Sequence, residues 1–359
     1  MIVERVDNSK NWDEELAYFN GGLFMTSAWL SAISNNDIKP VYLRFIQDDK
    51  PMAIAGGIEV LVGKGPAMQL LFYSGIASSS KDSFLIKKCK YELYRYAREN
   101  GYQRVVMKSY DNQSYIPAKI SEFKELERME YIFRFNNYKD PMIDGFSRSL
   151  RRKVRKAQRE GTVLKKSYSV ELIEKLFKLI NETYNIRQSK GYGAYVYLFL
   201  PYFGRNEIER LVSGKHAALY YAERQNEILS ISLVFSYQNK AYGILMGTSR
   251  NGYKAGAPSF MSYELACMLK EQGYAYLNIG GVQRGIKHKG LKDFKDSLGA
   301  DIVASSEEVT NFLNPPLSFL NPLLNLKRFL GDLKVLPWRL KKLIIDIIDL
   351  ILKKRDQLS

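Results

Sequence analysis

A basic segment in the second half of the chain carries the side chains best suited to chemistry. Residues 281–300 read GVQRGIKHKGLKDFKDSLGA and follow the strand-like run YAYLNIGG, which ends at Gly280 and Gly281. Ligands of open α/β sheets bind beyond strand tips, and glycine lets a substrate approach the backbone closely. The cationic side chains of the segment include Lys287, His288, Lys289, Lys292 and Lys295.

Lys295 is the candidate for a direct chemical role. When an acyl group is transferred to an amine, negative charge develops on the carbonyl oxygen, and a fixed ammonium group stabilises that charge. The alternative is that Lys295 is an ordinary surface lysine on a short helix.

The most basic stretch of the chain reads as an amphipathic helix. Leu150, Val154 and Ala157 recur at helical spacing and predict a buried seam. Seven of the thirteen residues from Arg148 to Glu160 are Arg or Lys, with a single acid. A stripe is formed by Arg148, Arg151, Arg152, Arg155 and Arg159. Guanidinium groups bind phosphates through paired hydrogen bonds, so the stripe is a candidate anion site; a solvated surface helix is the alternative.

A third candidate site precedes a later helix. In SRNGYKAGAPSF, Gly252, Gly256 and Pro258 predict a turn, after which the first amides of the helix would point outward and bind an anion. A plain junction between a loop and a helix is the alternative.

The sequence contains few residues that could support other catalytic mechanisms. His216 and His288 are the two histidines, so Ser-His-Asp and Cys-His arrangements have few candidates. No metal-ligand spacing and no glycine-rich phosphate loop occur, so we expect no metal and no permanently bound cofactor. Cys89 and Cys267 are expected to be buried, reduced thiols. Transfer of an activated acyl group to an amine needs two aligned substrates and a hydrogen-bond donor to the oxyanion, and the residues present can supply both.

The elements that position these residues form two similar series. The first series has strands at 40–46, 52–63 and 67–75, a helix at 82–100 and a strand at 102–110. The second has strands at 217–222, 228–237 and 240–249, a helix at 259–272 and a strand at 274–281. Each helix ends at a glycine, Gly101 or Gly273. The repeated order indicates an internal duplication. Further helices are predicted at 25–34, 148–160, 169–190 and 196–213.

The domain boundary is placed near Gly145, which gives predicted domains at 1–145 and 146–304 and a C-terminal segment at 305–359. The last segment is rich in Leu, Ile and Lys and reads as two amphipathic helices. Its apolar centre is too short and too charged to span a membrane. Residues 317–355 therefore predict either peripheral contact with a membrane interface or a cap on the core of the first domain.

Composition predicts a globular, cationic protein. The 359 residues are 46% hydrophobic and carry a formal net charge of +16. The chain is long enough for two cores, and its charge attracts nucleic acid, nucleotide phosphates or an anionic membrane surface. The first residues lack the pattern of a signal peptide. The expected location is the cytoplasm, with or without peripheral contact at the inner face of the membrane.

Several motifs in order resemble one enzyme family. RSLRRKVRKAQREG, GTSRNGYKAGAPSFMSYELACMLKEQGYAYLNIGGV and KGLKDFKDSLGA look like the second domain of Fem-type peptidoglycan-bridge aminoacyltransferases and of the wider BioF2-like GNAT acyltransferases. The resemblance covers roughly residues 145–304, and the first half matches by architecture. It implies an α/β fold of tandem GNAT-like domains, each a mixed central sheet flanked by helices.

The resemblance also implies a reaction. Fem enzymes move an aminoacyl group from a charged tRNA to the stem peptide of a cell-wall precursor. Their Phe-Lys pair matches Phe294 and Lys295, with the lysine at the reacting carbonyl. The implied function is N-acyl transfer to an amine of a phosphate-bearing cell-wall or lipid-linked precursor, with aminoacyl-tRNA or acyl-CoA as donor. An acyl-CoA-dependent enzyme of a polysaccharide or lipid pathway is one alternative, and a non-catalytic protein that binds nucleic acid or anionic membrane is another.

Overall fold

The computed structural model divides the chain into two compact units. Unit 1 comprises Met1–Leu126 and Glu307–Ser359, and unit 2 comprises Glu127–Ser306. The structure describes residues 1–7, 10–62, 67–111, 115–138, 142–189, 191, 203–283 and 289–310. The predictions for Lys287, His288, the start of the helix at 196–213 and the helices beyond Thr310 lie outside these residues.

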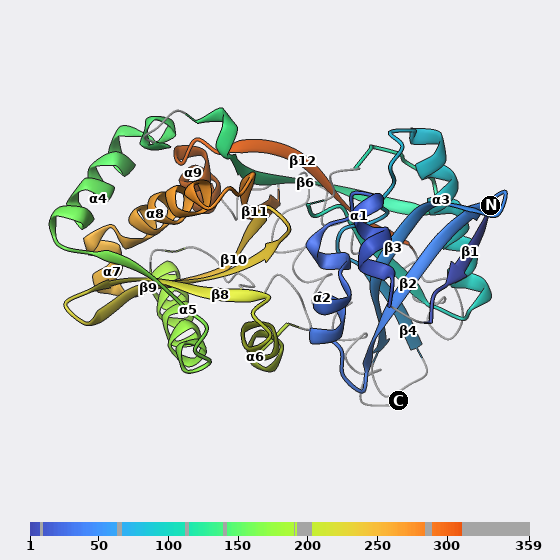
Figure 1. Ribbon diagram of the computed structural model, residues 1–359, viewed down its shortest axis with the longest axis horizontal. Coiled ribbons are helices and arrows are strands. Elements are labelled where there is room, and N and C mark those ends of the chain that lie inside the picture. Colours follow the sequence, from blue (N-terminus) through green and yellow to red (C-terminus); the bar gives the residue numbers. More distant parts are fainter. Residues whose placement is uncertain are drawn as a thin grey trace, which may run out of the picture. The chain divides into compact units, whose positions relative to one another are not determined.

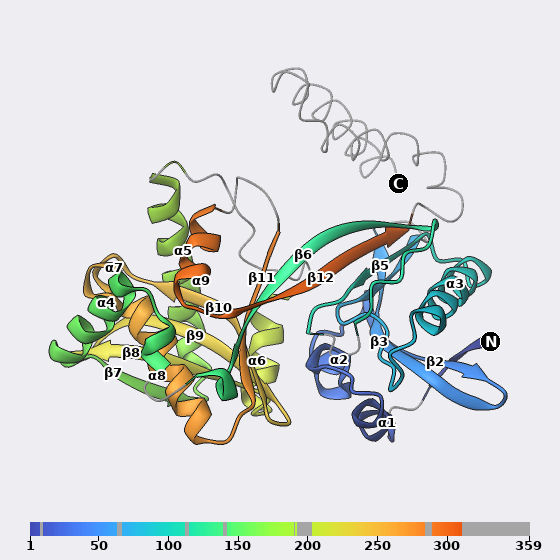
Figure 2. The same ribbon diagram turned by 90° about the horizontal axis from the view of Figure 1, so that it is seen from above.

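Unit 1 is a mixed sheet with helices on both faces. Its strands lie in the spatial order β1 (Ile2–Arg5), β2 (Ile38–Gln47), β3 (Lys50–Val62), β4 (Ala67–Phe72) and β5 (Arg104–Lys108). Its helices are α1 (Trp12–Tyr18), the short η1 (Leu23–Met25), α2 (Ser27–Ala32) and α3 (Ser83–Glu99). Strands β1 to β4 pair antiparallel, and α3 carries the chain to β5, which is parallel to β4. Figure 2 shows α3 on one side of these strands and α1 and α2 on the other.

Unit 2 repeats that arrangement. Its strands lie in the order β6 (Phe123–Arg134), β11 (Tyr276–Gln283), β10 (Lys240–Thr248), β9 (Glu227–Tyr237), β8 (Ala217–Arg224) and β7 (Val163–Ser167). Its helices are η2 (Phe135–Asn137), η3 (Met142–Gly145), α4 (Arg148–Arg159), α5 (Glu171–Ser189), α6 (Arg205–Ser213), α7 (Arg250–Ala255), α8 (Ala257–Glu271) and α9 (Lys289–Ser297). Strands β8, β9 and β10 pair antiparallel, and α8 leads to β11, which is parallel to β10.

Helices cover both faces of the sheet in unit 2. The main core lies on the face of α4 and α8, and it includes Leu150, Val154 and Leu265. Figure 1 shows these two helices on one side of the strands and α5 on the other. Gly247 of β10 allows α5 to pack closely, because a Cβ there would lie 2.6 Å from the backbone nitrogen of Ile180.

Short hairpins join the predicted strands in both units. Asp48 and Asp49 join β2 to β3 with φ of 52° and 58°, and Gln225 and Asn226 join β8 to β9 with φ of 51° and 64°. Two consecutive residues with positive φ are the mark of a two-residue turn whose twist suits an antiparallel hairpin. The duplicated order of elements predicted from the sequence is therefore confirmed.

The sequence patterns did not predict β1, β6, β7 or β12, and two of these strands, β6 and β12, link the units. Strand β6 lies antiparallel to β11 in unit 2. Strand β12 (Asp301–Thr310) ends in unit 1, where residues 307–309 pair antiparallel with β5. The chain thus leaves unit 1 along β6 and returns to it along β12, so the unit boundaries at Leu126 and Ser306 differ from the predicted boundaries. The prediction that the C-terminal helical segment begins at 305 is wrong, because residues 305–310 belong to β12.

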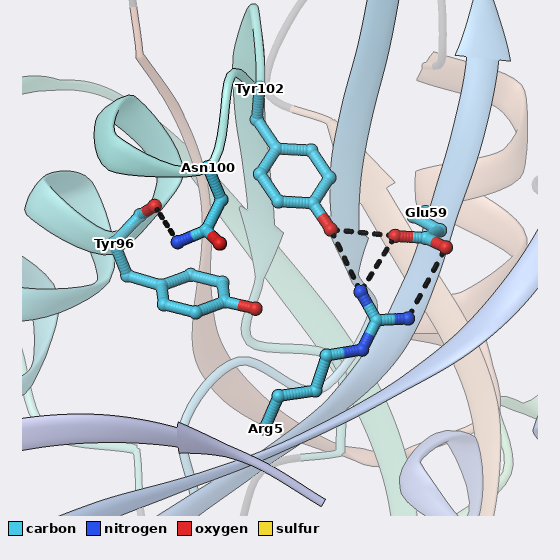
Figure 3. A network of polar contacts seen from close by, with 5 residues as sticks. All are labelled: Arg5, Glu59, Tyr96, Asn100 and Tyr102. Atoms are coloured by element: carbon cyan, nitrogen blue, oxygen red, sulfur yellow. Dashed lines mark hydrogen bonds and ion pairs between the residues drawn. The ribbon is translucent and has the colours of Figure 1, made fainter. Parts of the chain in front are cut away.

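A polar network fastens the edge strand β1 (Figure 3). Arg5 donates hydrogen bonds of 3.0 and 3.2 Å to the carboxylate of Glu59 on β3, and the Tyr102 hydroxyl donates to the same carboxylate at 2.6 Å. Burial would raise the pKa of Glu59, but the hydrogen bonds from Arg5 and Tyr102 outweigh burial and hold that pKa below its ordinary value. These groups satisfy one another within unit 1, so we assign the network a structural role.

Candidate functional site

The parallel strands β10 and β11 separate after a short paired stretch. Residues 240–242 of β10 pair with residues 276–278 of β11. Beyond that point β10 stays paired with β9 as far as Thr248, and β11 stays paired with β6 as far as Gln283. Two strand edges, 243–248 and 279–283, therefore have no strand partner among the described residues. Edges of this kind bind an extended chain through backbone hydrogen bonds. We call this place the fork.

A bulge in β11 lies where the fork opens. Asn278 pairs with Ile132 of β6 and Gly281 pairs with Glu130, so β11 has one residue more than β6 over this stretch. Gly280 has φ of 82°, which only glycine adopts at little cost. The bulge turns the peptide groups of residues 279–281 out of the regular ladder.

Lys295 of α9 holds this bulge. The residue is 7% exposed. Its Nζ donates to the carbonyl oxygens of Ile279, Gly280 and Gly281 at 2.7, 2.8 and 3.5 Å. The same nitrogen lies 5.5 Å from the centre of the Tyr131 ring, a favourable position for a cation. Lys295 is thus a buried group aimed at the backbone of the fork rather than an exposed surface lysine.

The environment of Lys295 makes its charge sensitive to pH. Burial lowers the pKa of Lys295 to about 7, and the negative charge of Glu130 acts in the opposite direction. Three carbonyl oxygens suit the three protons of an ammonium group. Lys295 can therefore hold or release a proton near neutral pH, as groups in active sites often do.

The other predicted residues of α9 do not join Lys295 at the fork. Phe294 is half-buried and packs against the core of unit 2. Lys292 forms an ion pair of 2.6 Å with Asp296, one turn along the same helix. Lys289 begins α9, but its side chain is outside the described residues, as is the whole of Lys287.

Two of the predicted site glycines pack closely against neighbouring elements. A Cβ on Gly281 would lie 3.1 Å from the carbonyl oxygen of Met129 on β6. Gly256, between α7 and α8, has φ of 80°, and a Cβ there would lie 3.0 Å from both Cβ and O of Lys153 on α4. These contacts concern the place of an added Cβ, so the close approach of a substrate to the backbone at Gly280 and Gly281 stays a prediction.

The junction at Gly256 also lacks the outward amides that the sequence suggested. Helix α7 runs directly into α8, and the amides of Ser259 and Phe260 bond to the Gly256 carbonyl at 3.1 Å. Residues 255–260 are buried. A close contact between helices, not an anion, explains this glycine.

Helix α4 presents the predicted arginine stripe to solvent. Ser147 caps its first turn by accepting from the amide of Leu150, and the seam of Leu150, Val154 and Ala157 is buried as predicted. Opposite that seam lies an open surface along the helix. It is lined by Arg148, Ser149, Arg151, Arg152, Arg155, Gln158 and Arg159. We call this surface the arginine face.

The cations of the arginine face lack counter-charges. Within the described part of the chain, no ion pair involves any of the five arginines of the stripe. The nearby acid Glu160 is already paired with Lys156 and Arg224. A row of unpaired guanidinium groups at a surface attracts phosphates.

Three functional neighbours of Lys295 were missed by the sequence analysis. Glu130 and Tyr131 come from β6, and Asn278 comes from β11. One signal was present in the sequence, since a lone asparagine inside the apolar run YAYLNIGG must find a hydrogen-bond partner once it is buried. Asn278 is fully buried and donates to Glu130 at 2.8 Å.

Comparison with known families identifies this part of the chain. Residues 145–296 match the family described as acetyltransferase (GNAT) domain, a stretch that includes both α4 and Lys295. Residues 145–296 therefore form a GNAT domain. GNAT domains are acyltransferase domains, so the fork and Lys295 lie in an acyltransferase.

The chain that carries this GNAT domain has the fold of several solved structures. FemX is 15% identical, with a TM-score of 0.67 over 89% of this chain and 99% of its own. L-PGS from Bacillus licheniformis is 16% identical, with a TM-score of 0.52 over 89% of this chain and 96% of its own. A conserved protein of Bacteroides thetaiotaomicron is 13% identical, with a TM-score of 0.53 over 86% and 100%. No curated protein sequence matches the chain.

Two searches of the described residues bear on the setting of the GNAT domain. None of the helices described here combines the length and hydropathy needed to cross a membrane. Across the same residues, no group of three or more His, Cys, Asp or Glu side chains is arranged to hold a metal ion.

Proposed function

We propose that unit 2 transfers an acyl group to an amine of a cell-wall or lipid-linked precursor, with the fork between β10 and β11 holding an extended substrate chain. The observation that carries this proposal is the meeting of two strand edges, which have no strand partner among the described residues, with a buried lysine, Lys295, at the bulge of β11. Free edges bind the amide groups of an acyl donor or a peptide.

The reaction needs one new bond and one broken bond. The amine nitrogen attacks the acyl carbon, the bond from that carbon to the leaving oxygen or sulfur breaks, and the proton of the amine passes to the leaving group. Negative charge develops on the carbonyl oxygen before that bond breaks. Lys295 keeps its bonds to Ile279 and Gly280 and redirects its third proton, now shared with Gly281 at 3.5 Å, to this oxygen.

The arginine face supports a donor with a phosphate backbone. Arg148 and Arg159 are eleven positions apart, which corresponds to roughly 16 Å of helix. Five unpaired charges over that length approach the density of a nucleic-acid strand, about one phosphate per 3.4 Å. A pyrophosphate is shorter than this row. We therefore favour aminoacyl-tRNA over acyl-CoA as the donor.

The proposed acceptor follows from the resemblance to Fem-type enzymes. It is a phosphate-bearing precursor with a free amine, and a membrane-linked acceptor would suit peripheral contact through residues 317–355. An acyl-CoA-dependent reaction in a polysaccharide or lipid pathway is the competing form of the same activity.

Lys295→Met tests the chemistry against a control on the same helix. The protein is incubated with charged tRNAs or with acyl-CoA thioesters, each with cell-wall precursors, and mass spectrometry identifies the acceptor that gains mass. We expect Lys295→Met to lower the transfer rate by roughly 10²–10³, the usual effect of losing an oxyanion donor. Lys292→Ala removes an exposed, ion-paired lysine and should leave the rate nearly unchanged. A rate for Lys295→Met equal to that of the wild type refutes the assigned role.

Binding without catalysis is the second candidate function, and the unpaired arginines favour it. RNA binding is measured as a function of salt for the wild type, for Arg151→Ala and for Arg155→Ala. Each of these two variants should lower the slope of log K against log salt by about 1. Arg205→Ala, which removes an arginine paired with Glu209, is the matched control. Salt-dependent binding without any acceptor that gains mass would favour the binding protein over the enzyme.

A further inference from the structure

Two buried groups of opposite charge in unit 2 are joined by a chain of amides. The Nζ of Lys295 donates to the carbonyl oxygen of Ile279 at 2.7 Å. The amide N–H of Gly280, which belongs to the same peptide group, donates to Oδ1 of Asn278 at 2.8 Å. The Nδ2 of Asn278 in turn donates to Oε2 of Glu130 at 2.8 Å. Three hydrogen bonds thus connect an ammonium group to a carboxylate through one backbone amide and one side-chain amide.

All three hydrogen bonds point the same way, from the cation to the anion. Each amide accepts at its oxygen and donates at its nitrogen, so the two charges polarise both amides in the same direction and strengthen every bond of the chain. The Gly280 amide and the Glu130 carboxylate together fix the orientation of the Asn278 side-chain amide. Exchanging its oxygen and nitrogen would set an NH₂ group against the Gly280 N–H and an oxygen against the Glu130 carboxylate.

The charge of Lys295 should be stabilised by the charge of Glu130, because both groups are buried. Lys295 and Glu130 are 7% and 3% exposed, and Asn278 is fully buried. Lys295 forms no salt bridge within the described residues. A buried charge is costly unless something compensates it, and the amide chain leads from Lys295 to a buried carboxylate.

We propose that Glu130 and Asn278 are positioning residues that keep Lys295 in its ammonium form through this amide relay. Glu130 supplies the balancing charge, and Asn278 transmits it while fixing the bulge at the opening of the fork. The relay matters for catalysis only under the proposed function, because the oxyanion is stabilised by the ammonium form of Lys295. The relay itself exists whichever acyl group is transferred.

Other ionisable groups also lie near Lys295 in the described part of the chain. Tyr131 of β6 presents its ring to the ammonium group, and its hydroxyl donates to Asp296 at 2.8 Å. Asp296 of α9 also pairs with Lys292, and the exposed Asp293 lies on the same helix. Strand β11 contributes backbone carbonyls and the neutral side chains of Asn278 and Ile279. Glu130 is therefore the buried acid of this set.

The test measures the titration of Lys295 and not the turnover of the enzyme. Competitive acylation of amines with acetic anhydride at a series of pH values, read by peptide mass spectrometry, gives the apparent pKa of Lys295. In Glu130→Gln this pKa should fall by about 1 or more. In Asn278→Ala it should fall as well, although Glu130 keeps its charge. Asp296→Asn is the matched control, and there we expect little change.

Each outcome decides between the relay and its alternatives. A pKa unchanged in Glu130→Gln overturns the proposal. A fall in Glu130→Gln but none in Asn278→Ala means that the charge acts through space, which overturns the relay. If Asn278→Ala does not fold, the wild-type protein provides the test. The ¹⁵N chemical shift of the Asn278 side-chain amide must then change with pH at the pKa of Lys295. A chemical shift that is constant with pH contradicts the relay. These results stand apart from the transfer assay, so either proposal can fail alone.

Discussion

Replacing Lys90 by methionine removes one half of a buried ion pair in unit 1. Lys90 of α3 lies 2.7 Å from the carboxylate of Glu308 on β12, and the two side chains are 4% and 6% exposed. Its Nζ also donates to the carbonyl oxygen of Ala118 at 2.7 Å. The pair joins the crossover helix of the first series to the strand that returns from the end of the second.

The expected loss follows from burial. Methionine keeps most of the volume of lysine, so the packing of α3 changes little. Glu308 stays buried without its Lys90 partner, and removing one member of a buried pair costs about 3–5 kcal/mol. That is a large part of a total stability of roughly 5–15 kcal/mol. In the double variant Lys90→Met/Glu308→Gln no charge of the pair remains, so we expect most of the loss to be recovered.

Urea unfolding followed by tryptophan fluorescence measures this loss. Trp12 and Trp29 are each 1% exposed in unit 1, so their emission reports on that unit. Arg95→Met is the matched control on the same helix, because Arg95 is half-exposed, pairs with Glu92 and Glu99 at the surface, and should cost about 0–1 kcal/mol. A loss for Lys90→Met as small as that of the control refutes the reasoning, and so does a double variant as unstable as the single one.

Two further predictions concern unit 2. The folded pKa of Lys295, about 7, lies below its ordinary value, so between pH 7 and about 10.4 the unfolded chain binds more protons and stability rises with pH. The free energy of unfolding of the wild type minus that of Lys295→Met should therefore increase over that window in urea titrations at stepped pH, and a constant difference contradicts the assignment. Gly256→Ala should lose more stability in thermal unfolding than Gly273→Ala. Both glycines have φ near 80°, but only Gly256 would place a Cβ 3.0 Å from Lys153, and nothing lies within 4 Å at Gly273. Equal losses would mean that helix packing at Gly256 is not tight.

The repeated architecture could be predicted because its signals are local. Alternating apolar residues marked the strands, helical spacing marked α3 and α8, and turn residues separated β2 from β3 and β8 from β9. Gly101 and Gly273 end matching helices with φ of 76° and 81°. Each signal involves residues only a few positions apart, so tertiary context had little opportunity to override it.

The candidate site was predicted only in part. The buried seam and exposed arginines of α4 follow from helical periodicity, and both are confirmed. Lys295 was chosen for its charge and its place after a strand, but its three carbonyl partners depend on a bulge that the sequence did not predict. The tight packing at Gly256 and Gly281 was not predicted, because their neighbours, Lys153 and Met129, are far away along the chain.

The amino-acid sequence alone determined the two series of strands and helices, the basic helix and the cationic segment that ends in α9, because periodicity, turn residues and charge act over short stretches. Tertiary structure decided which strands complete each unit, where β10 and β11 part, and that Lys295 is linked to Glu130. The bond between Asn278 and Glu130 joins residues 148 positions apart. An apolar strand pattern is satisfied by any partner that buries it, so only the folded chain selects β6 for β11 and brings the buried carboxylate to the lysine.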